Sequence, residues 1–165
     1  MKKLWFLLFV VLLLTGCSAE ETFETVNDAL AVPASAIVYE VSLGLPDEAS
    51  KQTIRQDMDV LYVCDNYILT VQKLDGGDLQ GTVKQISGFD KEDLTMIRTV
   101  REGFPCWHLT WTTSGEEEPQ VCRAVILDDG AQHHVVTVMA EASVSAQLAE
   151  QWQNVLSTVA LISTG

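Results

Sequence analysis

The chain has 165 residues, with 23 acidic residues against 10 Lys or Arg, and its formal net charge at pH 7 is −13. This charge argues against nucleic acid as a partner, because binding to phosphates requires a basic patch that displaces counterions. It favours solubility as the role of the acidic surface, with cation binding as the less favoured alternative.

The N-terminus has the features of a secretory signal, and we predict a signal peptide over residues 1–16. Lys2 and Lys3 precede an unbroken apolar run from Leu4 to Leu14. The run is too short for a membrane-spanning helix, which needs about 20 apolar residues, but it fits the hydrophobic region of a signal. An uncleaved anchor and an ordinary secretory signal are the alternatives, although no Ala-x-Ala-like site stands where an ordinary signal would be cut.

Cys17 closes the segment Leu14-Thr15-Gly16-Cys17 at the end of this run. The segment resembles the lipobox of bacterial lipoproteins. The resemblance implies that diacylglycerol is attached to the Cys17 thiol, that the signal is cut just before it, and that the mature chain is held at the bacterial cell membrane, facing the extracytoplasmic side. Two acyl chains would anchor it firmly, since each buried methylene contributes about 0.8 kcal/mol. The lipid bilayer is therefore the first expected partner.

Behind the lipidated cysteine we predict an acidic tether over residues 17–33 and a single domain over residues 34–165. The tether has no sustained apolar period. The remaining residues are numerous enough for one domain with its own core. With the signal removed, eight basic and 23 acidic residues remain, a net charge of −15. This charge would be repelled by an anionic membrane surface, which fits a body held off the bilayer by its tether.

Apolar and turn-forming residues alternate along the domain in a pattern typical of mixed helix and strand. Runs rich in β-branched residues between turn formers indicate strands, and apolar residues at steps of three and four behind a capping residue indicate helices. In chain order we first expect a strand at 36–43, an ambiguous segment at 47–55 in which Asp47 could cap a helical turn, and a hairpin of 60–64 and 67–71. A helix from Asp78 to Gly88 follows, and then four strands at 95–101, 106–112, 121–127 and 134–140. The chain ends with a helix capped by Ser143 or Ser145 and a short strand at 160–163 that could rejoin the sheet.

Several predicted strands are apolar at consecutive positions, such as Ala124–Leu127 and Val135-Val136. Such strands favour a sheet that is covered on both faces. The last helix carries an apolar stripe that includes Leu148, Trp152 and Val155. Together these features predict an α+β fold in which an antiparallel β-sheet meander is flanked by helices.

Two segments resemble the PsbP/DcrB-like group: GFPCWHLTW at 103–111, behind a Thr-Val-Arg-Glu strand, and the strand, helix and strand at 133–163. The resemblance covers about Val38 to Ser163 and implies an α/β/α sandwich. The group includes photosystem accessory subunits, envelope lipoproteins and a nuclear-import cofactor. Because its members share a fold without sharing a site, the resemblance identifies no functional residue.

Cys106 and Cys122 form a candidate disulfide. They are equidistant from Ser114, so a hairpin turning around Ser114 would place them opposite each other. Cross-strand Cβ atoms suit a disulfide only at a close pair, and the alternative is two buried thiols. Cys64 is expected to be a buried free thiol. Without a C-x-x-C motif, neither a thioredoxin-type site nor a zinc ribbon is supported.

The three histidines give no convincing metal site. His133 and His134 are adjacent, so on a strand they point to opposite faces and cannot jointly hold one ion. His108 could approach either of them, and a site that includes it with Cys64 or Cys106 is a minor alternative. Each histidine is expected at a strand end or on the surface. We therefore predict no metal and no cofactor.

Trp107 and Trp111 are four residues apart on one strand, so they face the same side. They could form a partner or ligand face, or pack in the core under a helix, with Trp152 supplying the contact from the last helix; core packing is favoured. No nucleophile motif such as G-x-S-x-G or S-x-x-K occurs, and the carboxylates cluster in turns.

The predicted function is therefore a membrane-anchored extracytoplasmic lipoprotein that acts as a non-enzymatic binding or accessory module, with an envelope protein as a candidate partner. The alternative is a small-molecule or cation-sensing envelope domain that uses an acidic cleft or the Trp107/Trp111 face. An envelope hydrolase is the least supported reading, because no convergent acid, base and nucleophile are evident.

Overall fold

The computed structural model describes residues 37–53, 60–113 and 118–164. These residues belong to one compact unit, Ala36–Gly165. The predicted signal peptide and tether, including Cys17, lie outside the described residues. No helix in the described ranges is long and apolar enough to cross a membrane.

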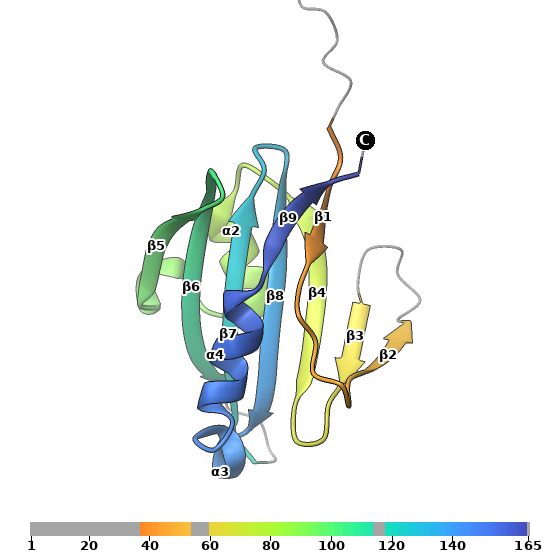
Figure 1. Cartoon of the computed structure of the whole chain (residues 1–165). Helices are drawn as coiled ribbons and strands as arrows, with labels where there is room; N and C mark the ends of the chain where they lie inside the picture. Colours follow the sequence, from red (N-terminus) through yellow and green to blue (C-terminus); the bar gives the residue numbers. More distant parts are fainter. Residues whose placement is uncertain (1–36, 54–59, 114–117, 165) are drawn as a thin grey trace, which may run out of the picture. The chain divides into compact units, whose positions relative to one another are not determined.

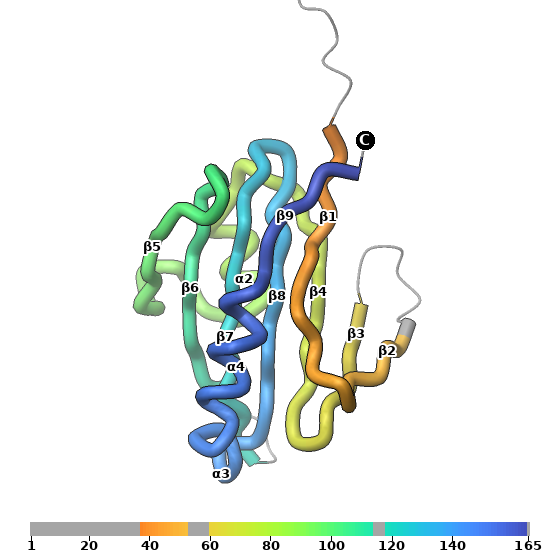
Figure 2. The backbone as a smooth tube through the Cα atoms, in the orientation of Figure 1, coloured from red at the N-terminus to blue at the C-terminus, as the bar shows by residue number. Residues whose placement is uncertain are grey.

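The unit is built around a seven-stranded antiparallel sheet with the order β2-β3-β4-β8-β7-β6-β5, and a separate two-stranded sheet pairs β1 with β9 (Figures 1 and 2). The strands are β1 (Tyr39–Ser42), β2 (Ser50–Thr53), β3 (Val60–Val63), β4 (Ile68–Asp75), β5 (Met96–Arg101), β6 (Phe104–Thr113), β7 (Gln120–Asp128), β8 (Gln132–Glu141) and β9 (Ala160–Ser163), and the helices are α2 (Leu79–Ser87), the 3-10 turn η2 (Lys91–Asp93), α3 (Ala142–Ser145) and α4 (Ala149–Ser157).

The large sheet is covered on both faces, which confirms the predicted α+β class. Helix α2 lies on one face, and α4 with the β1–β9 ribbon lies on the other (Figure 1). Consecutive apolar residues on β7 and β8 point to opposite faces of the sheet and are fully buried on both. Val125 and Val136 belong to the core on the α4 side, and Ile126 and Val135 belong to the core on the α2 side. The expectation from the apolar runs is therefore confirmed.

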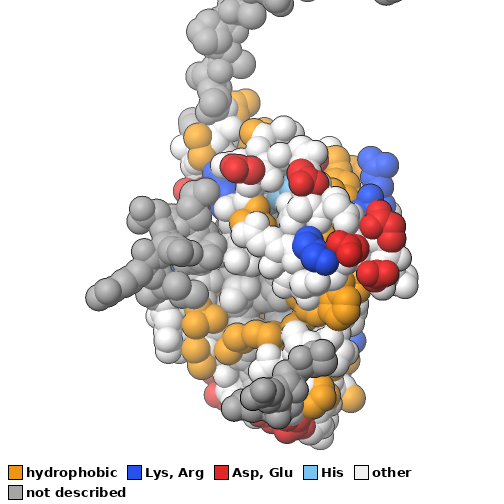
Figure 3. All heavy atoms as spheres, turned by 180° about the vertical axis from the view of Figure 1, so that it is seen from behind, with side chains coloured by type: hydrophobic (Ala, Val, Ile, Leu, Met, Phe, Trp, Pro, Cys, Tyr) orange, Lys and Arg blue, Asp and Glu red, His pale blue; other side chains and the backbone are white. Residues whose placement is uncertain are grey.

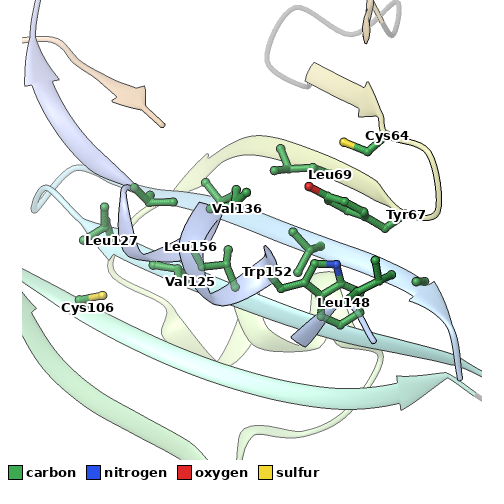
Figure 4. Close-up of a cluster of buried hydrophobic side chains, with 14 of the residues drawn as sticks. Cys64, Tyr67, Leu69, Cys106, Val125, Leu127, Val136, Leu148, Trp152 and Leu156 are labelled. Carbon is green, nitrogen blue, oxygen red and sulfur yellow. The ribbon is translucent and has the colours of Figure 1, made fainter. Parts of the chain in front are cut away.

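The α4-side core is organised around Trp152, which is fully buried. Its ring meets the Tyr67 ring edge-on, with 6.2 Å between centroids. Figure 4 shows this cluster, in which Leu148, the residue before α4, and Leu156 of α4 pack against side chains from the central strands. Burial of such side chains contributes about 1.5–3 kcal/mol each, so this cluster fixes α4 on the sheet.

Helix α2 begins and ends where the sequence predicts. The Asp78 carboxylate accepts a hydrogen bond from the Gly81 N–H at 2.9 Å, which satisfies one free donor of the first turn. Gly88 ends the helix at φ 80°, a left-handed conformation that glycine adopts without steric cost. Val83 points into the sheet and is fully buried.

Three details differ from the sequence-based expectation. The single C-terminal helix is two short helices, because Gln147 and Leu148 donate to carbonyls three residues back, which tightens the chain between α3 and α4. Neither Ser143 nor Ser145 caps α4, whose N-cap is Leu148 without a side-chain hydrogen bond. Strand β9 pairs with β1 instead of the large sheet.

The ambiguous segment at 47–55 contains a tight turn and an edge strand. The Ala49 N–H donates to the Pro46 carbonyl at 3.0 Å, and the chain then enters β2, which pairs with β3. Residues 54–59 lie outside the described ranges. The predicted hairpin around Asp65-Asn66 is confirmed, since β3 and β4 pair with Val63 opposite Ile68.

Candidate functional site

The candidate disulfide between Cys106 and Cys122 is wrong. Cys106 pairs with Leu127, and Cys122 pairs with Trp111, so the register is offset by five residues from the predicted one. Because five is odd, the two cysteines lie on opposite faces of the sheet. Cys106 is in the α4-side core, Cys122 is in the α2-side core, and both thiols are free. Cys64, expected to be a buried free thiol, is also buried and free.

Trp107 and Trp111 do lie on one face, under α2. Trp111 is 6% exposed and belongs to the α2-side core, and Trp107 packs against the same core. Trp152 is on the other face, so the expectation that it would contact this pair is wrong. The Arg98 guanidinium lies over the Trp107 ring, 6.0 Å from its centroid. The tryptophan pair is thus mainly a core contact, as favoured from the sequence.

His133 and His134 lie at the start of β8, one of the two positions expected for them, but they are buried and not at the surface. His133 and His134 are 1% and 2% exposed. Nδ1 of His133 lies 2.6 Å from the Thr82 hydroxyl on α2, and Nε2 of His134 lies 2.7 Å from the Asp129 carboxylate. Sequence reasoning missed both pairs: Thr82 is 51 residues from His133 along the chain, whereas Asp129 is only five residues from His134 across the β7–β8 turn.

Thr82, His133 and Asp128 have the residue types of a hydrolase triad, but their geometry does not suit catalysis. The Thr82 side chain is buried at 4% exposure, and Nε2 of His133 is 4.0 Å from the Asp128 carboxylate. A nucleophile must reach its substrate and hydrogen-bond its base. This group therefore serves to satisfy buried polar atoms between α2 and the sheet.

Asp129 lies in the β7–β8 turn, where its carboxylate is hydrogen-bonded to His134 and to backbone N–H groups of the turn. Burial opposes ionisation of its carboxyl, but the hydrogen bonds from His134, Gln132 and Ala131 outweigh burial and lower the Asp129 pKa. The two backbone bonds are short, 2.7 Å from Gln132 and 2.8 Å from Ala131. The carboxylate thus acts as a structural acceptor inside the turn.

The α4 face carries a groove of about 310 Å³, with β5, β6 and β7 as its floor and α4 as a wall. Among the described residues, those with charged or titratable side chains that line it are Arg101, His108 and Arg123, and none is a carboxylate. On a chain with a net charge of −13, this is a locally cationic site. The groove is the strongest candidate functional site of the described residues.

Arg123 lines the groove, and no described anionic group pairs with it. Its guanidinium lies over the Trp152 ring, 5.6 Å from the centroid, a contact that leaves its N–H donors free to bind an anion. No described carboxylate lies within ion-pair distance of it. One feature of the sequence could have indicated this site: Arg123 is the only basic residue in the apolar strand β7.

Arg101 joins β5 to the end of α4. One of its terminal nitrogens donates to the Leu156 and Val159 carbonyls, each at 2.8 Å. These acceptors lie at the negative end of the helix dipole, where a cation is favourable. Since arginine has five N–H donors, most of its donors are left for other groups. Arg101 thus both positions the groove wall and supplies charge to the groove.

His108 lies between the two arginines along the groove. Its Nε2 atom is 3.4 Å from the Thr99 hydroxyl and 3.5 Å from the Cys106 thiol. Burial, followed by the nearby Arg101 charge, lowers the His108 pKa from its ordinary value of 6.5. At neutral pH the ring is therefore neutral, and the fixed positive charge of the groove comes from the arginines.

A second hollow, of about 390 Å³, lies beside the β3–β4 turn and has the opposite character. Cys64, Asp65 and Glu141 line it together with Tyr67. Burial raises the pKa of the Cys64 thiol, so the thiol is neutral at pH 7. Burial, followed by a hydrogen bond with the Cys64 thiol, raises the pKa of the Tyr67 hydroxyl. Within those residues no group of His, Cys, Asp or Glu is placed to hold a metal ion.

The fold with a sheet covered by α2 on one face and by α4 on the other is of the PsbP/Mog1 type. The chain is similar to the cyanobacterial PsbP (CyanoP) of Synechocystis, with a TM-score of 0.54 and 8% identity over 79% of this chain and 96% of that chain. It is also similar to the Ran-binding protein Mog1p of Saccharomyces cerevisiae, with a TM-score of 0.51 and 10% identity over 78% and 98%.

A third similar structure is a protein from Bacteroides thetaiotaomicron, with a TM-score of 0.52 and 12% identity over 76% of this chain; the match spans 46% of that longer protein. No family model matches the sequence, and no curated protein matches it. At these identities the likeness establishes the fold and assigns no site.

Proposed function

We propose that the mature chain is a lipid-anchored envelope protein that binds an anionic partner, without catalysis, in the groove between α4 and strands β5–β7. One observation carries the proposal: Arg101, Arg123 and His108 line a groove in which no described residue supplies a carboxylate, on a strongly acidic chain. Charge placed against the overall charge of a protein selects partners by electrostatic complementarity. A cation sensor at this groove is disfavoured for the same reason.

Lipid anchoring rests on the sequence around Cys17. The short cationic and apolar start and the Leu-x-Gly-Cys segment support it. Cys17→Ala should give a chain that incorporates no labelled fatty acid, and the wild type should incorporate it. Incorporation by the variant at the wild-type level would contradict lipidation at this residue. The expected location is the extracytoplasmic side of the bacterial cell membrane.

A binding role agrees with the chemistry of the groove. Beside the groove, the Cys106 thiol lies 3.5 Å from Nε2 of His108, as a nucleophile would from its base, but Cys106 has no exposed surface. A thiol that is closed off from solvent cannot attack a substrate. The fold also occurs in a Ran-binding protein, which supports protein binding as a use of this architecture and does not identify the partner here.

Charge reversal in intact membranes tests the groove. Arg123→Glu reverses a groove charge, and Lys51→Glu on β2 makes the same charge change at the other end of the sheet. After chemical cross-linking, the wild type and Lys51→Glu should recover the same envelope component, and Arg123→Glu should recover at least tenfold less. Equal recovery from all three would overturn the proposed function. Circular dichroism confirms that each variant is folded.

A further inference from the structure

Strand β5 is a terminal strand of the large sheet, and no described strand pairs with its outer side. In an antiparallel pair, alternate residues direct their N–H and C=O groups away from the neighbouring strand. An outer strand of this kind therefore presents unpaired backbone groups, which another extended chain can bind. Figure 1 shows β5 at the edge, next to β6.

The two terminal strands of the sheet, β2 and β5, differ in the features that prevent pairing with another chain. Strand β2 has four residues, all polar, and includes Lys51, which are features that prevent unwanted pairing. Strand β5 has six residues and no lysine or proline. Ile97 and Val100 on β5 are 62% and 71% exposed. They lie on opposite faces, since one is paired with His108 and the other with Pro105 across β6.

The charged residues of β5 are all basic. Arg98 and Arg101 are three residues apart, so one lies on each face of the sheet. Neither has a described carboxylate within ion-pair distance. Within the β5–β6 hairpin the only acidic residue is Glu102, which is in the turn. An added strand with a carboxylate on each face would place those carboxylates beside the two arginines, about 4.8 Å from β5.

We propose that β5 is the docking edge for an extended, acidic segment of a protein partner, which adds an eighth strand to the sheet and pairs its carboxylates with Arg98 and Arg101. This inference rests on the proposed function, because it identifies the anionic partner as a protein. Ile97 and Arg101 line the groove as well, so the edge and the groove form one continuous surface.

A second copy of this chain fits the edge less well. Pairing β5 with β5 would bring the arginines of two strands together, and like charges across a strand pair are unfavourable. Two chains that each carry a charge of −13 would also repel each other. Charge complementarity therefore favours an acidic segment of another protein as the occupant.

The probe is the peptide acetyl-Thr-Val-Glu-Thr-Val-Glu-Thr-Val-amide. Its glutamates are three residues apart, so they fall on opposite faces and can match the arginines in either strand direction. It is titrated against the full mature chain in detergent micelles, by fluorescence anisotropy. The controls are the same peptide with lysine in place of glutamate and a version that is N-methylated at alternate residues.

We expect the glutamate peptide to bind, to slow hydrogen exchange of β5 amides, and to bind at least tenfold less tightly after Arg98→Glu. Lys51→Glu should leave its affinity within twofold, and both control peptides should bind at least tenfold less tightly. An N-methylated peptide that binds as well as the parent would overturn strand addition.

The failures of the two proposals are distinguishable. If the peptide does not bind while Arg123→Glu still abolishes recovery of the partner, strand addition is wrong and the proposed function stands. If the peptide does not bind and Arg123→Glu does not reduce recovery of the partner, both proposals are wrong. Protection of β5 amides in the free chain, or a dimer that Arg98→Glu dissociates, would show that the occupant is this chain itself and would overturn the inference.

Discussion

The surface around α2 and the groove beside α4 differ in how their charged groups are paired. Under α2, Thr82 and His133 are buried and satisfy each other, and on the surface of that side Lys84 pairs with Asp90 at 3.1 Å. Viewed from there, acidic and basic side chains lie next to one another (Figure 3). Beside α4, Arg123 faces a groove that is lined by no carboxylate from the described part of the chain. Charged groups on the surface of α2 are thus paired within the chain, whereas Arg123 in the groove has no described carboxylate as a partner.

The largest effect should come from the core of the α4 face. Trp152→Ala removes a fully buried indole, and such a truncation costs about 3–5 kcal/mol. Trp107→Ala, in a partly buried position on the other face, should cost clearly less. Urea unfolding of both variants gives the comparison. Equal losses would contradict the role of Trp152 as the centre of its cluster.

The next effect tests the buried pair on the α2 face. Thr82→Val keeps the shape of the side chain and leaves Nδ1 of His133 without its partner, which should cost about 1–3 kcal/mol of unfolding free energy. Thr112→Val on β6, where the side chain is exposed, should change stability by less than about 0.5 kcal/mol. A Thr82→Val variant as stable as the wild type would show that the contact contributes nothing to folding.

A smaller effect concerns pH. Because the Asp129 pKa is lowered in the folded state, the folded chain binds fewer protons at this site than the unfolded chain. Its stabilising contribution is present above the ordinary value of 3.8 and is lost as pH falls through the folded pKa. Melting temperatures between pH 6 and pH 3 should fall less steeply for Asp129→Asn than for the wild type. Identical slopes would contradict this assignment.

The smallest effect belongs to the groove. Since the His108 pKa is lowered below 6.5, the ring gains its proton only at acidic pH and then adds positive charge. Binding of the glutamate peptide should strengthen severalfold as pH falls from 7 to 5, where the peptide carboxylates remain mostly ionised. His108→Gln should flatten this dependence. The same pH profile in the variant would exclude His108 as the titrating group.

The sequence predicted the elements that depend on local signals. Helix α2 was predictable because Asp78 and Gly88 mark its ends, and β7 and β8 because their apolar runs are continuous. The break between α3 and α4 was not, since the apolar stripe runs across it. It depends on backbone hydrogen bonds of Gln147 and Leu148 that carry no sequence signature.

The groove could not be predicted because it depends on strand register, and the Thr82–His133 pair could not because it depends on how α2 packs on the sheet. A shift of five residues between β6 and β7 decided that Cys106 and Cys122 lie apart. The same register places Arg123 opposite Thr110 on the groove side. Arg101 and Arg123 are 22 positions apart, and only the β5-β6-β7 order brings them to one surface.

The central claim is that the partner binds at the groove beside α4 and not on the surface of α2. Gln153 on α4 lines the groove, and Gln85 on α2 is exposed on the opposite face, so a photo-cross-linking residue at each position gives a matched pair in intact membranes. We predict a cross-linked envelope protein from position 153, lost on Arg123→Glu, and none from position 85. Equal cross-linking from both positions, or cross-linking from position 85 alone, would contradict the claim.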